Sequence, residues 1–164
     1  MNAIVAVDRE WGIGKNGQLL THLPEDMKFF REKTTDMNIV IGRKTLESFP
    51  GGKPLPDRHN IVITTNENYL AEGCTVCLGI EALRQVLSEF PDDEIFVCGG
   101  ERVYKEMLPF ADTLWVTKID AVYGADKFFP DVDADEDFEV TWESEEHEYK
   151  GTKFRFTKYE RKQS

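Results

Sequence analysis

Asp26 is the side chain best suited to acid–base or binding chemistry, because of the residues that share its helix face. It lies in the first turn of a helix expected over 24–33, and Phe29 and Phe30 follow three and four residues later. Side chains with this spacing point from one face of a helix. A carboxylate beside aromatic rings is costly unless a cation or donor pairs with it. Asp26 is therefore a candidate for binding a cationic or amidine-like heterocycle, and apolar surroundings should raise its pKa. An acid is also favoured there by the helix dipole alone.

Two further stretches carry a glycine turn from the end of an apolar strand into a helix. They cover residues 39–45 and 96–102. The unpaired N–H groups at a helix start bind anions, and Arg43 and Arg102 add positive charge beside them. Two such junctions in one small chain indicate a ligand with more than one phosphate. Glu101 argues weakly against this, since it places an acid at the second junction.

The elements that must position these groups alternate between strand and helix. Several expected strands are near-continuous apolar runs, as in strands buried on both faces. We expect strands over 3–7, 38–41, 60–64, 75–78, 94–98 and 113–118. We expect helices over 24–33, 43–48, 80–89 and 101–108. This alternation predicts an α/β fold with a mostly parallel central sheet of about eight strands and flanking helices.

The end of the chain has a different pattern. Residues 138–145 and 153–159 alternate apolar and polar side chains, and Lys150 and Gly151 lie between the two segments. Period-two alternation of this kind is typical of strands with one exposed face. We therefore expect an antiparallel hairpin at a sheet edge.

Two familiar motifs lack the surroundings they need. Residues 12–17 fit the dinucleotide pattern G-x-G-x-x-G, but no helix opens there, and the next one is expected only at Pro24. A glycine-rich loop that covers a site and moves is the better interpretation. Cys74 and Cys77 have C-x-x-C spacing but lie on an expected strand, where positions three apart face opposite ways. We interpret them as buried, inert thiols.

Composition excludes several functional classes. The chain has 164 residues and a formal net charge of −11, and ten of its 31 acids fall within 131–148 without any Lys or Arg. The remainder is nearly neutral, so nucleic-acid binding through the whole surface is disfavoured. The three cysteines suggest no disulfide framework, and the three histidines no metal site. We expect a cytoplasmic protein that binds neither nucleic acid nor a membrane, and no apolar stripe in the sequence demands an oligomer.

Taken in order, the segments resemble the dihydrofolate reductase family. Each motif is modest, but the ordered set covers nearly the whole chain and is highly specific. The matching segments are 4–8, 12–17, 23–30, 41–48, 54–61, 97–104, 114–117 and 128–131. The resemblance implies one domain over 1–164 that reduces 7,8-dihydrofolate to tetrahydrofolate with NADPH. Hydride would pass to pterin C6 and a proton to N5, and antifolates would bind the same site.

The resemblance also implies roles on the substrate side. Asp26 would bind the pterin N3 and 2-amino group, supported by a hydrogen bond from Thr117. Phe30 would pack on the rings, and Arg58 would hold the α-carboxylate of the glutamate tail. The implied catalytic residues are Asp26, Thr21 and Tyr104. The implied substrate-binding residues are Ile4, Val5, Asp26, Met27, Phe30, Phe49, Leu55, Arg58, Cys98 and Thr117.

On the cofactor side, the resemblance implies close approach of Gly99 and Gly100 to the pyrophosphate. Arg43, Thr65 and Arg102 would lie at or near the 2′-phosphate, which favours NADPH over NADH. Residues 10–20 would form a mobile lid over the nicotinamide. The implied cofactor-binding residues are Ala6, Ile13, Gly14, Asn16, Leu19, Gly42, Arg43, Lys44, Thr45, Thr64, Thr65, Cys98, Gly99, Gly100, Glu101, Arg102, Val103 and Tyr104.

The chain departs from the family pattern at Thr21, where a tryptophan is usual. Because threonine has less bulk, we hypothesise a wetter site with altered proton delivery and inhibitor affinity. Lys127 also replaces the usual small hydroxyl residue after Asp126.

Two other functions stay open on sequence alone. One is a pyrimidine reductase of the riboflavin pathway, which would also use NADPH; Asp26 and Arg58 argue for folate instead. The other is a catalytically idle binding module whose acidic segment 131–148 recruits a basic partner. A run of acids is more often a solvated loop and edge strand.

Overall fold

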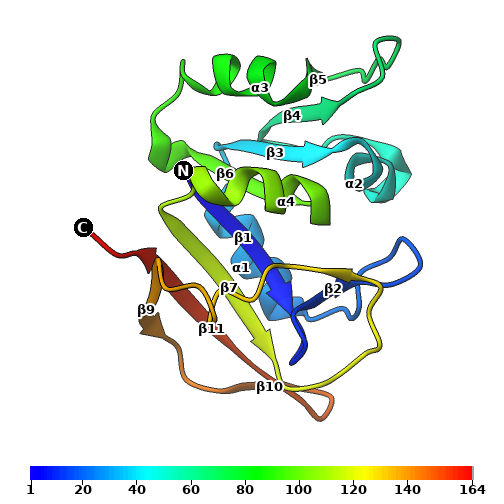
Figure 1. The fold of residues 1–164 in the computed structure, drawn as a ribbon. Coiled ribbons are helices and arrows are strands. Elements are labelled where there is room, and N and C mark those ends of the chain that lie inside the picture. Colours follow the sequence, from blue (N-terminus) through cyan, green and yellow to red (C-terminus); the bar gives the residue numbers. More distant parts are fainter. Residues whose placement is uncertain (164) are drawn as a thin grey trace.

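Nine strands form one main sheet, with helices packed on both of its faces, in the computed structural model, which describes residues 1–163 (Figure 1). The strand order is β10-β11-β7-β1-β6-β3-β4-β5, with β9 also paired to β11. The strands of this sheet are β1 Asn2–Val7, β3 Asn38–Gly42, β4 His59–Thr64, β5 Cys74–Leu78, β6 Ile95–Gly99, β7 Thr113–Ile119, β9 Phe138–Glu143, β10 His147–Tyr149 and β11 Thr152–Arg161.

The centre of the sheet is parallel, as the apolar runs predicted. Strands β1, β3, β4, β5, β6 and β7 pair in parallel with their neighbours among this set. Ile39, Val40 and Ile41 on β3 are all fully buried, because helices cover both faces at this position. The mostly parallel α/β fold with flanking helices is confirmed.

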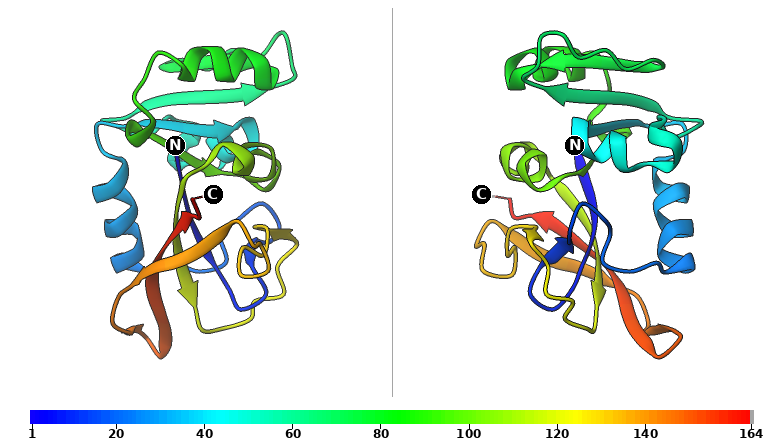
Figure 2. Two further views of the ribbon diagram at one scale, coloured as in Figure 1. Left: turned by 60° about the vertical axis from the view of Figure 1, so that its left-hand side comes forward. Right: turned by 90° about the vertical axis from the view of Figure 1, so that its right-hand side faces the viewer.

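The α-helices divide between the two faces of the sheet (Figure 2). They are α1 Pro24–Thr34, α2 Arg43–Ser48, α3 Gly79–Leu87 and α4 Glu101–Met107. On one face, Phe29 and Phe30 of α1 pack with Ile4 and Phe96, and Leu46 of α2 packs with Val62.

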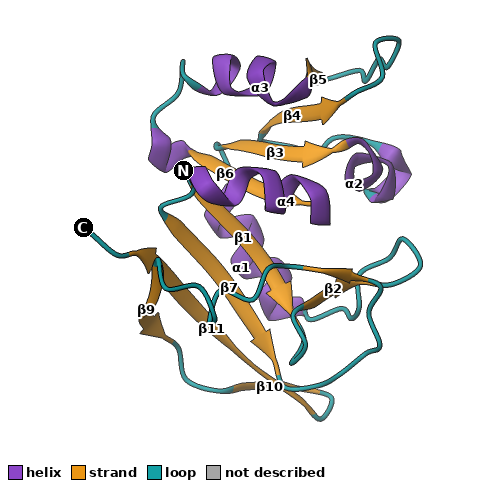
Figure 3. Cartoon of the chain, in the orientation of Figure 1, coloured by secondary structure: helices purple, strands orange, loops and turns teal. Residues whose placement is uncertain are grey.

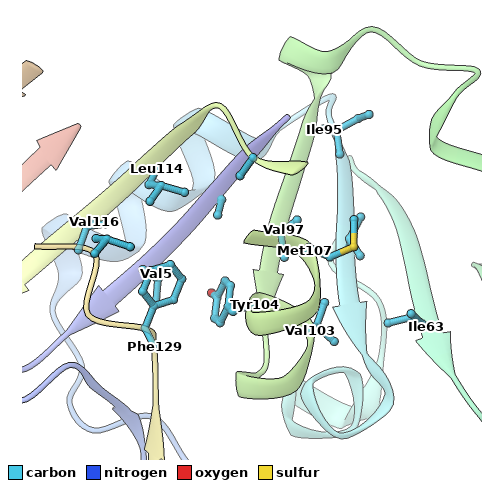
Figure 4. Packing of buried hydrophobic residues seen from close by; sticks show 14 of the residues in the cluster. Val5, Ile63, Ile95, Val97, Val103, Tyr104, Met107, Leu114, Val116 and Phe129 are labelled. Carbon is cyan, nitrogen blue, oxygen red and sulfur yellow. The ribbon is translucent and has the colours of Figure 1, made fainter. Parts of the chain in front are cut away.

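The other face holds the larger core, to which α3 and α4 contribute. Leu83 of α3 and Met107 of α4 join Val97 and Leu114 of the sheet there, as Figure 4 shows for part of this cluster. The observed bounds of the four helices differ from those expected by at most two residues at either end.

The C-terminal region differs in part from the expected hairpin. β9 and β11 are antiparallel, as predicted. However, the turn at Lys150 and Gly151 joins β11 to β10, a three-residue strand that the sequence pattern did not reveal. The ten residues of β11 are long enough to pair with β10 near their start and with β9 near their end.

A second, two-stranded sheet was also not expected (Figure 3). It pairs β2 Gly12–Gly14 with β8 Lys127–Phe128. The glycine-rich stretch 12–17 therefore opens no helix, in agreement with the sequence argument. Cys74 and Cys77 face opposite sides of β5, because one packs in the α2-side cluster and the other in the larger core. Within residues 1–163, no helix is both long and apolar enough to cross a membrane.

Candidate active site

Asp26 lies where α1 meets the middle of the sheet. Pro24 begins this helix and suits its first position, since proline lacks the N–H that would be unpaired there. The Thr117 hydroxyl on β7 donates to Asp26 Oδ1 at 2.6 Å. Burial raises the pKa of the Asp26 carboxyl above its ordinary value, and this hydrogen bond offsets part of the rise. The geometry gives one weakly solvated carboxylate, held in position by the hydroxyl of Thr117, a residue that is 2% exposed.

Tyr104 reaches the same region from the opposite face of the sheet. Its hydroxyl donates to the Ile4 carbonyl at 2.7 Å, and its ring packs edge-on against Phe129. Burial raises the pKa of Tyr104 well above its ordinary value, with further contributions from Cys98 and Asp26. Tyr104 is therefore joined to β1, the strand next to the one that carries Thr117.

An apolar wall continues from Asp26 along α1. Phe30, Leu55 and Cys98 pack in one cluster with Ile4, and Phe49 joins Cys98 in the neighbouring cluster. These contacts bring together most of the residues expected on the substrate side.

Two of the expected substrate residues lie apart from that wall. The Val5 side chain belongs to the large core on the other face of β1. Met27 is 48% exposed on the outer side of α1. Only a main-chain or rim contact is open to these two residues.

Arg58 lies at the far end of this wall. Its Nε donates to the Thr34 hydroxyl at 2.9 Å and one terminal nitrogen donates to the Pro56 carbonyl at 3.2 Å. Its guanidinium lies 5.7 Å from the centre of the Phe30 ring. Because a guanidinium has five N–H donors, three remain for a carboxylate.

The two strand–glycine–helix junctions meet at the carboxyl ends of β3 and β6. Ile41 is paired with Gly99 across these strands. A Cβ added at Gly100 would lie 3.3 Å from the Thr45 hydroxyl, and one at Gly42 would lie 3.2 Å from Val103. Gly99 has a φ of +134°, which L side chains rarely adopt. The two junctions therefore bring main-chain atoms of Gly42, Gly99 and Gly100 together, with little room for side chains.

Arg43 and Arg102 carry positive charge next to these junctions. Arg43 lies 3.6 Å from Glu47 and Arg102 lies 2.9 Å from Glu106, each pair along its own helix. The Arg102 side chain is 77% exposed, and Lys44 and Thr65 are exposed as well. Thr64 is instead buried, and its hydroxyl accepts the Asn66 N–H.

The loop that follows β2 is held by the segment around β8. The Asn16 N–H donates to the Asp126 carboxylate at 3.0 Å, and the Asp126 N–H donates to the Gly14 carbonyl at the same distance. Leu19, further along the loop, is 81% exposed. Ile13 packs on the large core, and Ala6 and Thr21 are half-buried.

Two contacts near the site were not found by sequence reasoning. The Phe128 N–H donates to the Glu101 carboxylate at 2.7 Å, which explains why an acid is tolerated at the second junction. His147 Nδ1 lies 2.7 Å from Glu25, the neighbour of Asp26. Both contacts join residues more than twenty positions apart, so no local pattern could reveal them.

A separate surface hollow of about 530 Å³ lies beyond the end of β1. Trp11, Lys118 and Arg155 are among its lining residues, and none of the expected site residues is. Within residues 1–163, His, Cys, Asp and Glu side chains form no group of three that could hold a metal ion.

Comparison with known protein families shows the family to which the chain belongs. It matches the family model for dihydrofolate reductase over residues 1–161. The chain belongs to the dihydrofolate reductase family. The dihydrofolate reductase of Bacillus subtilis (strain 168) is 37% identical over 168 residues, which cover 98% of this chain and 94% of that protein. The dihydrofolate reductase of Enterococcus faecium is 41% identical over 144 residues, covering 87% and 83%.

A solved dihydrofolate reductase structure has the same fold. It is the enzyme from Enterococcus faecalis complexed with NADP(H) and RAB-propyl, with a TM-score of 0.88 and 35% identity. The match covers 99% of this chain and 96% of that one. Family membership sets aside the pyrimidine-reductase alternative and agrees with the ordered motifs of the sequence.

Proposed function

We propose that this chain reduces 7,8-dihydrofolate to tetrahydrofolate with NADPH. The observation that carries the proposal is the Asp26 carboxylate, which is held by Thr117 beside an aromatic wall. Few ligands suit such a group, because they must offer both an apolar ring and adjacent N–H donors. The pterin ring offers both. The two junctions at Gly42 and at Gly99 and Gly100 are suited to a nucleotide cofactor.

On the substrate side, Asp26 accepts N–H groups from pterin N3 and the 2-amino group. Its negative charge favours the substrate protonated at N5, which is the form that accepts hydride. Thr117 fixes the orientation of the carboxylate. Phe30, Leu55 and Phe49 exclude water from the benzoyl group, and the remaining N–H groups of Arg58 bind the α-carboxylate.

On the cofactor side, the junction residues fit a dinucleotide. Side chains at Gly42 and Gly100 would press against Val103 and Thr45, so glycine at these positions lets a pyrophosphate approach the main chain. Arg43 and Arg102 stand where they can bind the 2′-phosphate that distinguishes NADPH from NADH. When bound, NADPH supplies the hydride for the reaction. The Tyr104 hydroxyl donates a hydrogen bond to the Ile4 carbonyl and so positions the main chain of β1 beneath the nicotinamide and pterin rings.

We further propose that the chain acts as one domain over 1–164, as a cytoplasmic monomer. Antifolate inhibitors occupy the substrate site, and nucleic acid is not a partner. The net charge of −11 supports this last point, because it repels phosphate backbones. The acids of 131–148 contribute in part to internal ion pairs, such as Asp133 with Lys118 and Asp137 with Arg161. This supports a structural role for the segment rather than recruitment of a basic partner.

The test is the loss of near-ultraviolet NADPH absorbance when dihydrofolate is added to purified protein, with NADH as a control. We expect oxidation that depends on dihydrofolate and is faster with NADPH. Binding of NADPH without turnover would contradict the proposed reaction and direct attention to Thr21.

A further inference from the structure

Glu101 holds two separate parts of the molecule together. It is the first residue of α4, directly after the glycines of the second junction. Its Oε2 accepts the Phe128 N–H at 2.7 Å, and 27 residues separate the two along the chain. A carboxylate that accepts a main-chain N–H makes a stronger bond than a neutral acceptor does. The start of α4 is thereby fixed to β8.

β8 is a short strand, held otherwise by β2 and by the hydrogen bond that the Phe129 N–H donates to the Trp11 carbonyl at 2.8 Å. It has two residues and pairs only with β2 among the strands of residues 1–163. A two-stranded sheet of this size is marginally stable by itself. Phe129, which is 2% exposed, anchors the base of this sheet to the large core. The Phe128 N–H, next to Phe129 in the chain, adds a second anchor, to Glu101 of α4.

The small sheet in turn supports the glycine-rich loop. Gly12 pairs with Phe128 and Gly14 with Lys127. Beyond them, the Asn16 N–H donates to Asp126, the residue before β8. The position of residues 12–16 therefore depends in part on β8, and the position of β8 depends in part on Glu101.

Glu101 also places a negative charge directly after Gly100, where the proposed function puts a pyrophosphate. Electrostatics alone would favour a neutral residue at that position. A residue that opposes phosphate binding must be explained by what else it does. The bond to Phe128 is the contact that accounts for it.

We propose that Glu101 is a positioning residue for the nicotinamide half of NADPH. Its carboxylate ties α4 to β8 and so keeps residues 12–16 over the nicotinamide, while it weakens binding of the diphosphate half. The inference rests on the proposed function, because it assumes that NADPH binds at the two junctions.

Three substitutions separate charge from hydrogen bonding. Glu101→Gln removes the charge but keeps an oxygen that can accept the Phe128 N–H. Glu101→Ala removes both, and Glu101→Met does the same with a side chain of similar length. Glu81→Gln is the matched control, because Glu81 is an exposed acid in the first turn of α3, a helix that follows neither junction.

The first measurement is amide hydrogen exchange in the protein without cofactor. We expect exchange at Phe128 and at 12–14 to be about tenfold faster in Glu101→Ala and Glu101→Met, the factor for loss of a charge-assisted hydrogen bond. Glu101→Gln should show a smaller increase, because its amide oxygen still accepts the Phe128 N–H but without the assistance of the charge. Glu81→Gln should exchange like the wild type. Equal exchange in all four variants would overturn the proposal.

The second measurement compares the Kd of NADPH with that of 2′-phospho-ADP-ribose, which keeps the diphosphate and the 2′-phosphate but has no nicotinamide. The ratio of the two constants reports the contribution of the nicotinamide half. All three Glu101 variants should bind the fragment a few-fold more tightly than the wild type, at about the strength of one nearby charge. The ratio should fall by about tenfold in Glu101→Ala and Glu101→Met and by less in Glu101→Gln.

The outcomes distinguish this inference from the function on which it rests. If the wild type binds NADPH but the ratio is the same in Glu101→Ala and Glu101→Gln, the positioning role is wrong and the function stands. If the wild type binds neither ligand, the proposed cofactor is wrong and the positioning role falls with it.

Discussion

The proposed substrate side and the proposed cofactor side of the candidate site are built in different ways. Beside α1, the decisive group is one carboxylate, Asp26, whose burial raises its pKa. At the two junctions, the decisive groups are main-chain atoms beside Gly42, Gly99 and Gly100, with exposed cations next to them. In the first arrangement, the chemistry depends on one titratable carboxylate. In the second, binding depends on the shape of the main chain over several residues. The two sides should therefore respond to different perturbations: the substrate side to pH and the cofactor side to glycine substitution and salt.

The largest effect is expected at Asp26. Asp26→Asn should fold and lose about 10²–10⁴-fold in turnover at neutral pH, the usual range for a group that assists proton transfer. Part of the activity should return at low pH, where the substrate is already protonated. A pH profile of kcat for both proteins measures this. Wild-type turnover in the variant at neutral pH would remove Asp26 from the mechanism.

The same substitution should affect stability in the opposite direction. The raised pKa of Asp26 means that its contribution to stability is present below its unfolded-state pKa and is lost as pH rises through the folded-state value. Asn has no charge to desolvate, so Asp26→Asn should be the more stable protein at neutral pH. We expect a gain of about 1 kcal/mol in the free energy of unfolding. Urea unfolding at pH 7 should show this gain, and a loss there would contradict the assigned desolvation.

A smaller effect is expected at the junctions, and it should separate the glycines. Gly99→Ala forces an L side chain to a φ of +134°, which should lower the free energy of unfolding by about 1–3 kcal/mol. NADPH binding should weaken about tenfold, because the main chain must shift. Gly42 has a φ of −80°, so Gly42→Ala should lose less stability. Chemical unfolding and a Kd titration of both variants measure the difference, and equal losses would show that space, not backbone conformation, limits both.

The cations next to the junctions should have effects that salt can remove. Arg102→Gln should raise the Kd of NADPH about tenfold and leave that of NADH nearly unchanged, because only NADPH has the 2′-phosphate. The effect should shrink between about 0.05 M and 0.5 M salt, since exposed charges are screened. Lys53→Gln, at another exposed cation, is the matched control. An effect of Arg102→Gln that is equal for both cofactors would contradict the assignment.

The smallest effect is expected at Thr21. Thr21→Trp should change turnover or antifolate affinity by a few-fold, because an indole would exclude water from a site that the threonine leaves more open. Steady-state kinetics and inhibitor titration measure this. No change in either quantity would end the wetter-site hypothesis.

Much of this architecture was predictable because it depends on local pattern. The apolar run at 38–41 specified a buried strand, and the glycine after it specified where α2 begins. Phe30 could be placed beside Asp26 because helix geometry alone determines which side chains share a face. The pairing of α1 with β7 through Asp26 and Thr117 was implied only by the family resemblance.

The parts that escaped prediction depend on contacts between distant residues. β8 has two residues and no apolar period, so only its pairing with β2 makes it a strand. β10 is defined by its pairing with β11 and its packing against Phe154, not by its own composition. Glu101 could be recognised as an acid in an unfavourable place, but its partner Phe128 could not be identified before the chain was folded.

The N-termini of α2 and α4 have a consequence for the lifetime of the protein. Both helices follow a glycine and have no side-chain cap, so part of each helix start depends on groups from outside the chain. A ligand that binds only the folded state at 100 times its Kd adds about 2.7 kcal/mol to stability. If that ligand is NADPH, the cell's supply of reducing cofactor sets how much of this protein survives heat and proteolysis. Abundance would then follow metabolic state without any change in synthesis.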